Sequence, residues 1–107
     1  MGGREARAED LISFRPAAAR ELIEAVAYYE REREGRGQRF ATAIEGALVL
    51  IAGLPQAHPI LLAPDIRSIK VRRFPYRVVY VVLADTIDVI AVAHAKRRPG
   101  YWRRRPI

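Results

Sequence analysis

Apolar side chains recur at two different spacings along the chain, and the change of spacing divides it into a helical part and a strand part. Apolar side chains recur at helical intervals from Ala18 to Tyr29, in a predicted helix that has Pro16 at its first position, where proline is favoured, and that ends near Gly35. A second stripe with the same period runs from about residue 38 to residue 52. Gly35 and Gly37 separate the two stripes, so the sequence predicts a helical hairpin.

Strands are predicted on both sides of this hairpin. Residues 11–14 form a short apolar segment that is typical of an edge strand. Three prolines within residues 55–64 predict an irregular loop, because proline lacks an amide donor. The period then becomes two over residues 68–72. Residues 76–83 and 87–93 follow as strands, and the last is apolar on both faces, which favours a central position in the sheet.

This order of elements defines an α+β fold, β-α-α-β-β-β, with a two-helix hairpin packed on one face of a small antiparallel sheet. We expect one domain over residues 11–102, a flexible N-terminal tail at 1–10 and a basic C-terminal tail at 103–107. The helices cover one sheet face. The face that carries Lys70 and Arg72 is therefore expected to stay open and to form the functional site.

Basic side chains are concentrated in the second part of the chain. Residues 1–65 hold 8 basic and 10 acidic side chains, whereas residues 66–107 hold 11 basic and 2 acidic ones, and the formal net charge is +7. Such a segment favours polyanions such as RNA, DNA or an acidic protein segment. The alternative, charge for solubility alone, does not require this segregation. The absence of cysteine favours the cytoplasm, and no segment resembles a signal peptide or a membrane anchor, so we expect no membrane contact.

Familiar enzyme signatures are missing from the sequence. It contains no glycine-rich phosphate loop and no nucleophile elbow, and its two histidines, His58 and His94, lie far apart along the chain without clustered carboxylates. We therefore expect no cofactor and no metal.

The candidate site consists of phosphate-handling side chains on the predicted strands and just after the last one. For binding a partner or a nucleic acid, the candidates are Lys70, Arg72, Arg77, Lys96, Arg97, Arg98 and Trp102. Metal-free RNA cleavage needs a base, an acid and cations near the phosphate. For that chemistry, and only if the protein is a ribonuclease, the candidates are Lys70, Arg72, Arg77, Arg97, His94 and Tyr101.

Simpler structural roles compete with some of these assignments. His94, at a strand end, is equally well explained by a structural hydrogen bond, because neighbouring cations favour its neutral form. Trp102 is better explained by packing back over the sheet than by stacking on a base. Arg103 to Arg105 are expected to be solvated.

Three segments together resemble the toxins of the RelE/ParE superfamily, over residues 11–102. They are the helix that ends in YYERE, the strand pair RSIKVRRFPYRVVYVV, and the last strand with its extension, IDVIAVAHAKRRPGYW. The resemblance implies a toxin encoded beside an antitoxin, with a helical hairpin against an antiparallel sheet. The antitoxin's disordered segment would fold around the toxin.

Two branches of this superfamily act in different ways. In RelE-like members, basic residues cut messenger RNA on the ribosome, and Lys70, Arg72, Arg77 and Arg97 fall on such positions. Ser68, however, replaces a lysine of that pattern, and Tyr101 is out of register with the expected tyrosine. The FPY turn and the AHAKRRPGYW ending resemble more closely the ParE-like, plasmid-stabilisation branch, whose characterised members poison DNA gyrase.

The resemblance therefore favours a cytoplasmic ParE-like toxin that inhibits replication through DNA gyrase. Its implied partners are a cognate acidic antitoxin, DNA gyrase and, through the antitoxin, operator DNA. One alternative is a RelE-like, ribosome-dependent, metal-free mRNA endoribonuclease. A nontoxic remnant that binds nucleic acid is the other.

Overall fold

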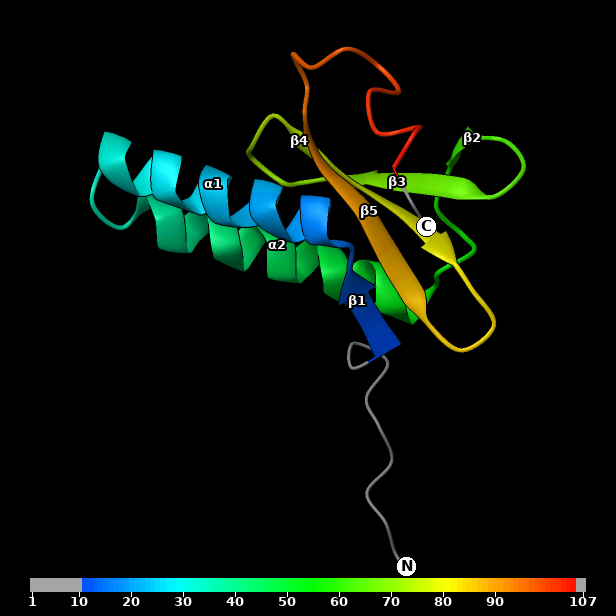
Figure 1. Ribbon diagram of the computed structural model, residues 1–107. Coiled ribbons are helices and arrows are strands. Elements are labelled where there is room, and N and C mark those ends of the chain that lie inside the picture. Colours follow the sequence, from blue (N-terminus) through cyan, green and yellow to red (C-terminus); the bar gives the residue numbers. More distant parts are fainter. Residues whose placement is uncertain (1–10, 106–107) are drawn as a thin grey trace, which may run out of the picture.

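Two helices and a five-stranded sheet make up the computed structural model, which describes residues 11–105 (Figure 1). The predicted tail at 1–10 and the last two residues lie outside the described part. In chain order the elements are β1 (Ile12–Phe14), α1 (Pro16–Glu32), α2 (Arg36–Gly53), β2 (Ile60–Leu62), β3 (Ile66–Lys70), β4 (Tyr76–Val82) and β5 (Ile87–His94). The predicted α+β class and the helical hairpin are confirmed.

The sheet is mixed, with strand order β1-β5-β4-β3-β2. Strands β2 to β5 form the antiparallel part, whereas β1 pairs parallel with β5, so the expectation of a purely antiparallel sheet is wrong at this edge. The helical hairpin carries the chain from β1, at one edge of the sheet, to β2 at the opposite edge. No tight turn joins β1 to its neighbour β5, so the two strands can run parallel. Strand β2 forms inside the proline-containing loop that was expected to be irregular. As its apolar run predicts, β5 lies inside the sheet.

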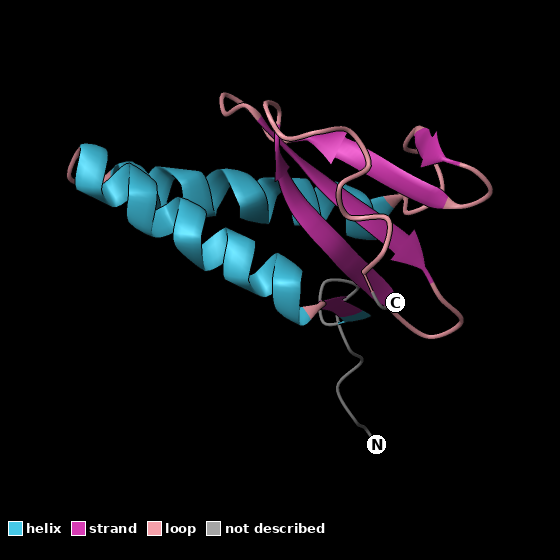
Figure 2. Cartoon of the chain, turned by 45° about the horizontal axis from the view of Figure 1, so that its top comes forward, coloured by secondary structure: helices cyan, strands magenta, loops and turns pink. Residues whose placement is uncertain are grey.

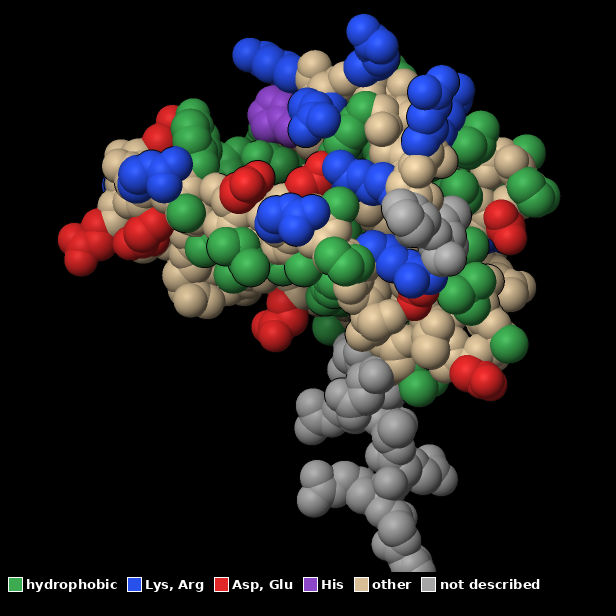
Figure 3. Space-filling view, in the orientation of Figure 1, with side chains coloured by type: hydrophobic (Ala, Val, Ile, Leu, Met, Phe, Trp, Pro, Cys, Tyr) green, Lys and Arg blue, Asp and Glu red, His purple; other side chains and the backbone are tan. Residues whose placement is uncertain are grey.

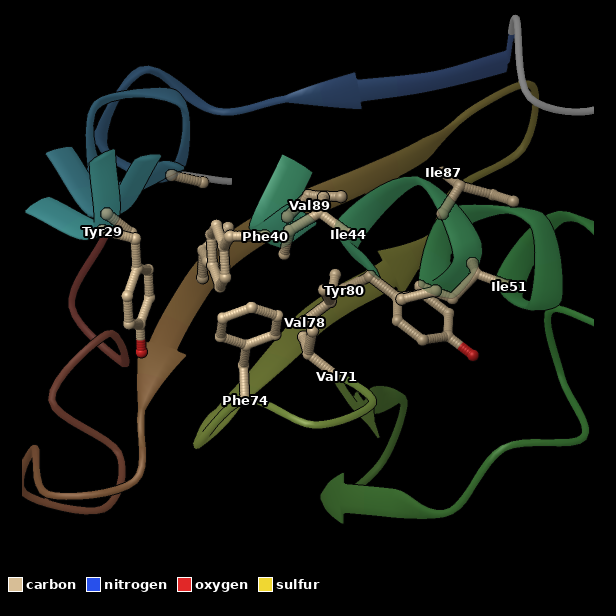
Figure 4. Close-up of a cluster of buried hydrophobic side chains, with 14 residues drawn as sticks. Tyr29, Phe40, Ile44, Ile51, Val71, Phe74, Val78, Tyr80, Ile87 and Val89 are labelled. Carbon is tan, nitrogen blue, oxygen red and sulfur yellow. The ribbon is translucent and has the colours of Figure 1, made fainter. Parts of the chain in front are cut away.

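The main core lies between the helices and one face of the sheet. Aromatic rings fill the end near the turn between β3 and β4: the Tyr29 and Phe40 rings lie 5.0 Å from that of Phe74, centroid to centroid (Figure 4). Farther along, Tyr80 is fully buried and its hydroxyl donates to the Pro55 carbonyl oxygen at 2.5 Å. Figure 4 shows Ile44 and Ile51 of α2 among these side chains.

The opposite face of the sheet is not open. The C-terminal segment (residues 95–105) turns back across it, as Figure 2 shows for the loop that passes in front of the strands. Trp102, 4% exposed, packs on Val79, Val81 and Ile90. The expectation of a free sheet face is therefore wrong over this region, because the second apolar face of β4 and β5 also needs cover.

The turn between the helices depends on two glycines and one carboxylate. Gly35 has a φ of 87°, which favours glycine. The Glu30 carboxylate accepts hydrogen bonds from the backbone N–H groups of Gly35 and Gly37, at 3.0 Å in each case. At Gly37 the helices approach so closely that an added Cβ would lie 2.7 Å from the Val26 carbonyl oxygen. Neither helix within residues 11–105 is long and apolar enough to cross a membrane.

Gly37→Ala tests this close approach. The added methyl group would push against the backbone oxygen of Val26 and against the Glu30 side chain that binds the turn, so we expect the free energy of unfolding to fall by about 2 kcal/mol in urea titrations. Gly53→Ala is the control, because a Cβ there meets open space, and it should change stability by less than about 0.5 kcal/mol. Equal stability of the two variants would contradict this account of the turn.

Candidate functional site

Basic side chains surround a hollow between the C-terminal segment and the sheet, which we call the sheet-face hollow. Figure 3 shows lysine and arginine side chains gathered over this region, next to a histidine. The hollow has a volume of about 230 Å³. Its floor includes Leu62, Val79 and Ala93, and its wall includes His94 and Tyr101. Its cations are Arg77, Arg97, Arg98 and Arg103.

The register of β3 and β4 brings two of the predicted cations together. Lys70 is directly opposite Arg77, and side chains opposite each other in an antiparallel pair lie on the same face. The Arg77 Nε donates to the Ser68 hydroxyl at 3.0 Å, and Ser68 is buried. Ser68 thus orients the Arg77 guanidinium at the rim of the hollow.

Arg72 does not join this group. It stands in the turn after β3 and lines a second depression, between that turn and α2, which we call the α2 groove. Lys70, at the end of β3, lines this groove too. The predicted set is thus divided between two surfaces. The residues that line the α2 groove are Arg33, Arg36, Gln38, Arg39, Thr42, Ala43, Gly46, Ala47, Leu50, Lys70, Arg72, Arg73 and Phe74.

Four cations of the α2 groove were not among the predicted site residues. Three of them, Arg33, Arg36 and Arg39, follow one another at intervals of three, from the C-cap of α1 to the first turn of α2. That spacing was the available signal. The fourth, Arg73, lies next to the predicted Arg72.

Tyr101 belongs to a bonded network beneath the C-terminal segment. Its hydroxyl donates to Glu21 Oε2 at 2.6 Å, and the Arg105 guanidinium donates to both oxygens of the same carboxylate at 2.9 and 2.8 Å. The backbone N–H of Val92 donates to Glu21 Oε1 at 3.0 Å. Arg105 is therefore bound rather than solvated, and this differs from the expectation for the end of the chain.

The network shifts the pKa values of both acidic partners. Burial would raise the pKa of Glu21, but hydrogen bonds from Arg105, Tyr101 and Val92 outweigh it and hold the pKa below its ordinary value of 4.5. The pKa of Tyr101 is raised, first by burial and then by its bond to the Glu21 carboxylate. The Tyr101 hydroxyl therefore stays protonated at neutral pH and releases its proton less readily than an ordinary tyrosine.

His94 is also occupied by a structural bond. Its Nδ1 accepts the backbone N–H of Lys96 at 2.9 Å, and its ring packs edge-on against Tyr76, with the centroids 4.9 Å apart. In this arrangement Nδ1 is a hydrogen-bond acceptor for the backbone. This agrees with the structural interpretation of His94.

The remaining predicted residues differ in exposure. Lys96, Arg97 and Arg98 are exposed on the C-terminal segment, and the Arg97 guanidinium lies 3.8 Å from the centroid of the Tyr101 ring. Trp102 is buried, in agreement with its packing interpretation, and its ring cannot stack on a base in this arrangement. The sheet-face hollow therefore offers cations for binding an anion, while its tyrosine and histidine are held by internal bonds.

Comparison with known proteins places this architecture in a family. Residues 12–99 match the family described as the ParE toxin of the type II toxin-antitoxin system, parDE. This chain belongs to that toxin family. A solved structure titled "Chromosomal ParDE TA system from P. aeruginosa" has a similar fold, with a TM-score of 0.69 and 14% sequence identity over 79% of this chain and 95% of that chain. No curated protein matches the sequence.

Glu21→Gln tests the network under the C-terminal segment. We expect it to lower the free energy of unfolding by about 2 kcal/mol at neutral pH, because charged hydrogen bonds to Arg105 are lost. The folded pKa of Glu21 lies below its ordinary value of 4.5, so the contribution is present above that pH and is lost as the pH falls through the folded value. Thermal melts should show the two proteins converging in acid.

The control is Glu24→Gln, which removes an exposed carboxylate from the same helix. It should change the melting temperature little at any pH. A difference between wild type and Glu21→Gln that is as large in strong acid as at neutral pH would contradict the role given to the Glu21 charge.

Proposed function

We propose that this protein is a ParE-like toxin that inhibits replication by poisoning DNA gyrase in the cytoplasm. Membership of the ParE toxin family supports the toxin class. The cations around the sheet-face hollow suit a gyrase surface or its bound DNA, because arginine binds carboxylates and phosphates through paired hydrogen bonds. A cognate acidic antitoxin neutralises the toxin, and the complex contacts operator DNA through the antitoxin.

One observation favours binding over RNA cleavage. The two groups best suited to transfer protons near the hollow, Tyr101 and His94, are committed to Glu21 and to the Lys96 backbone. The arginines beside them stay protonated and cannot act as bases. A surface of fixed cations supports recognition of an anion without supplying the acid and base that cleavage requires.

The target is tested by two assays run in parallel. The purified chain is added to gyrase with plasmid DNA, and separately to a translation reaction in which message ends are mapped. We expect gyrase-dependent DNA breaks and intact messages. Cleaved messages with normal supercoiling would replace this proposal by the ribosome-dependent endoribonuclease, and normal growth on induction of folded protein would indicate the nontoxic remnant.

Arg97→Ala combined with Arg98→Ala tests the contribution of the hollow. Both side chains are exposed, so the fold should persist, while gyrase inhibition should weaken by about tenfold. Arg104→Ala is the matched control, because Arg104 is exposed on the same segment but does not line the hollow. Equal inhibition by the double variant and the control would remove the hollow from the proposed target surface.

Antitoxin binding is tested with the product of the adjacent reading frame, which we expect to be small and acidic. An acidic segment that neutralises Lys70 and Arg77 should bind more weakly as salt is raised, because the ion pairs are screened. Reversing both charges, Lys70→Glu with Arg77→Glu, should weaken binding by about tenfold in calorimetry, whereas Arg31→Glu on α1 should not. Binding that is insensitive to salt and to the double reversal would indicate an apolar contact instead.

A further inference from the structure

A third depression lies between α1 and the C-terminal segment, and we call it the tyrosine cleft. Its volume is about 170 Å³. A space of this size takes one side chain of a partner, because a whole small-molecule ligand needs roughly 300 Å³ or more. Its aromatic and charged lining consists of Glu21, Glu24, Tyr28, Tyr76, His94, Arg97 and Tyr101.

Helical spacing builds the α1 wall of this cleft. Glu21, Glu24 and Tyr28 are three and four residues apart, so they project on one side of the helix. The Tyr28 hydroxyl donates to Glu32 Oε2 at 2.8 Å, and its ring packs edge-on against that of Tyr29, with the centroids 5.3 Å apart. The Tyr28 ring, 49% exposed, is thus held in place with part of its surface open to a ligand.

Tyr76, at the start of β4, adds a second ring to the cleft. It packs against the rings of Phe40 and His94, each 4.9 Å away between centroids. Its hydroxyl is partly buried and has no hydrogen-bond partner among residues 11–105, unlike the hydroxyls of Tyr28 and Tyr101. A polar group that leaves water without a partner costs free energy, so this hydroxyl favours a ligand that can donate to it.

The two carboxylates of the cleft differ in their partners. Glu21 binds Arg105, Tyr101 and the backbone of β5, so its charge is balanced. Glu24 forms no ion pair and accepts no hydrogen bond within the described part of the chain. Arg97 stays on the opposite wall, over the Tyr101 ring, and does not pair with Glu24. The α1 wall therefore carries one negative charge that the chain leaves unpaired.

Two other places in this molecule show what a tyrosine ring and a carboxylate bind together. The Arg36 guanidinium lies 4.9 Å from the centroid of the Tyr29 ring and pairs with Glu32 at 3.2 Å. The Arg105 guanidinium lies 5.0 Å from the centroid of the Tyr101 ring and pairs with the carboxylate beneath the C-terminal segment at 2.8 Å. In both cases a single guanidinium contacts a ring and a carboxylate.

From this repeated arrangement we infer that the tyrosine cleft binds an arginine side chain of a protein partner. Tyr28, Tyr76 and Glu24 supply the same groups, and no cation among residues 11–105 lies over either ring. A guanidinium is planar, stacks on aromatic faces and bonds a carboxylate through paired N–H groups. A further N–H can donate to the Tyr76 hydroxyl. The inference goes beyond the proposed function, because the sheet-face hollow attracts anions whereas this cleft takes a cation.

Other ligands fit the tyrosine cleft less well. A lysine ammonium is a compact charge that cannot stack on the rings or bond a carboxylate through a planar fork. A phosphate would meet two carboxylates on the α1 wall, and like charges repel. Nucleic acid is therefore disfavoured at this position, although it suits the cations of the sheet-face hollow.

The probe is the capped tripeptide acetyl-Gly-Arg-Gly-amide. The comparison peptides carry lysine, or citrulline, which keeps the shape of arginine without its charge, and a thymidine dinucleotide tests nucleic acid. Binding is followed by NMR at constant ionic strength, through the ring signals of Tyr28 and Tyr76. We expect the arginine peptide to shift both signals and to bind about fivefold more tightly than the citrulline peptide and about twofold more tightly than the lysine peptide.

Two variants test the groups that carry the inference. Glu24→Gln removes the unpaired carboxylate and Tyr28→Leu removes a ring, and each should weaken binding of the arginine peptide by about threefold. Both positions are exposed, so the fold should persist, and thermal melts check this. The matched controls are Glu45→Gln, exposed on α2, and Ile23→Ala, exposed on α1. Neither lines the cleft, and both should bind like wild type.

Equal binding of the arginine and citrulline peptides would overturn the inference, and so would unchanged binding by Glu24→Gln. No shift of the Tyr28 signal with arginine peptide up to about 50 mM would also overturn it. A dinucleotide that shifts both ring signals as strongly as the arginine peptide would indicate a nucleic-acid site instead.

Failure here can be told apart from failure of the proposed function. The assay contains no gyrase. The double variant Arg97→Ala with Arg98→Ala, which should weaken gyrase inhibition, should bind the arginine peptide at least as tightly as wild type, because a like charge leaves the cleft wall.

Discussion

Two strands with apolar side chains on both faces impose the main constraint on this fold. β4 and β5 bury Val78 and Val92 toward the helices and Val79 and Ala91 toward the opposite side. Burial of apolar surface is the dominant favourable contribution to folding, so neither face can be left to water. The helices cover one face, and the segment after β5 covers the other. The position of the basic residues in that segment follows from this requirement.

Glu21 connects the helices that cover one sheet face to the C-terminal segment that covers the other. It projects from α1, on the helical side, and binds Tyr101 and Arg105 of the C-terminal segment as well as the backbone of β5. Its carboxylate is largely buried, and four donated hydrogen bonds offset the cost of burying its charge. One of these bonds engages the Tyr101 hydroxyl at the wall of the sheet-face hollow. An interaction that closes the fold therefore also engages a side chain that lines the hollow.

Most of the fold could be predicted from hydrophobic spacing because that spacing records which face of each element is buried. The helix limits agree to within about three residues, which is close to the usual spread of helix ends. β2 escaped prediction because its pairing with β3 depends on a partner close in space, not on a pattern of its own. The parallel direction of β1 is likewise a consequence of where the helical hairpin returns the chain.

The site was harder to predict than the fold. Charge segregation identified Lys70, Arg72, Arg77 and Arg97 as candidate cations. It could not show that Lys70 and Arg72 line a different depression from Arg77 and Arg97, since that depends on how the end of β3 and the following turn project. Nor could it show that the end of the chain folds back onto Glu21, because residues 21 and 105 are distant in sequence. Apolar character on both faces of the last strand was the available sign that a second cover was needed.

The bonds from Glu21 and Arg105 to β5 have a consequence for how the molecule behaves in a crowded solution. Beyond the short β1, the outer side of β5 would present unpaired backbone groups, which can recruit a strand from another molecule. Glu21 occupies the N–H of Val92, and Arg105 occupies the carbonyl oxygen of Ile90 at 3.1 Å. The side chains of Glu21 and Arg105 thus take the place of a neighbouring strand. Because they form an ion pair and occupy these backbone groups, they oppose pairing of this edge with a strand of another molecule.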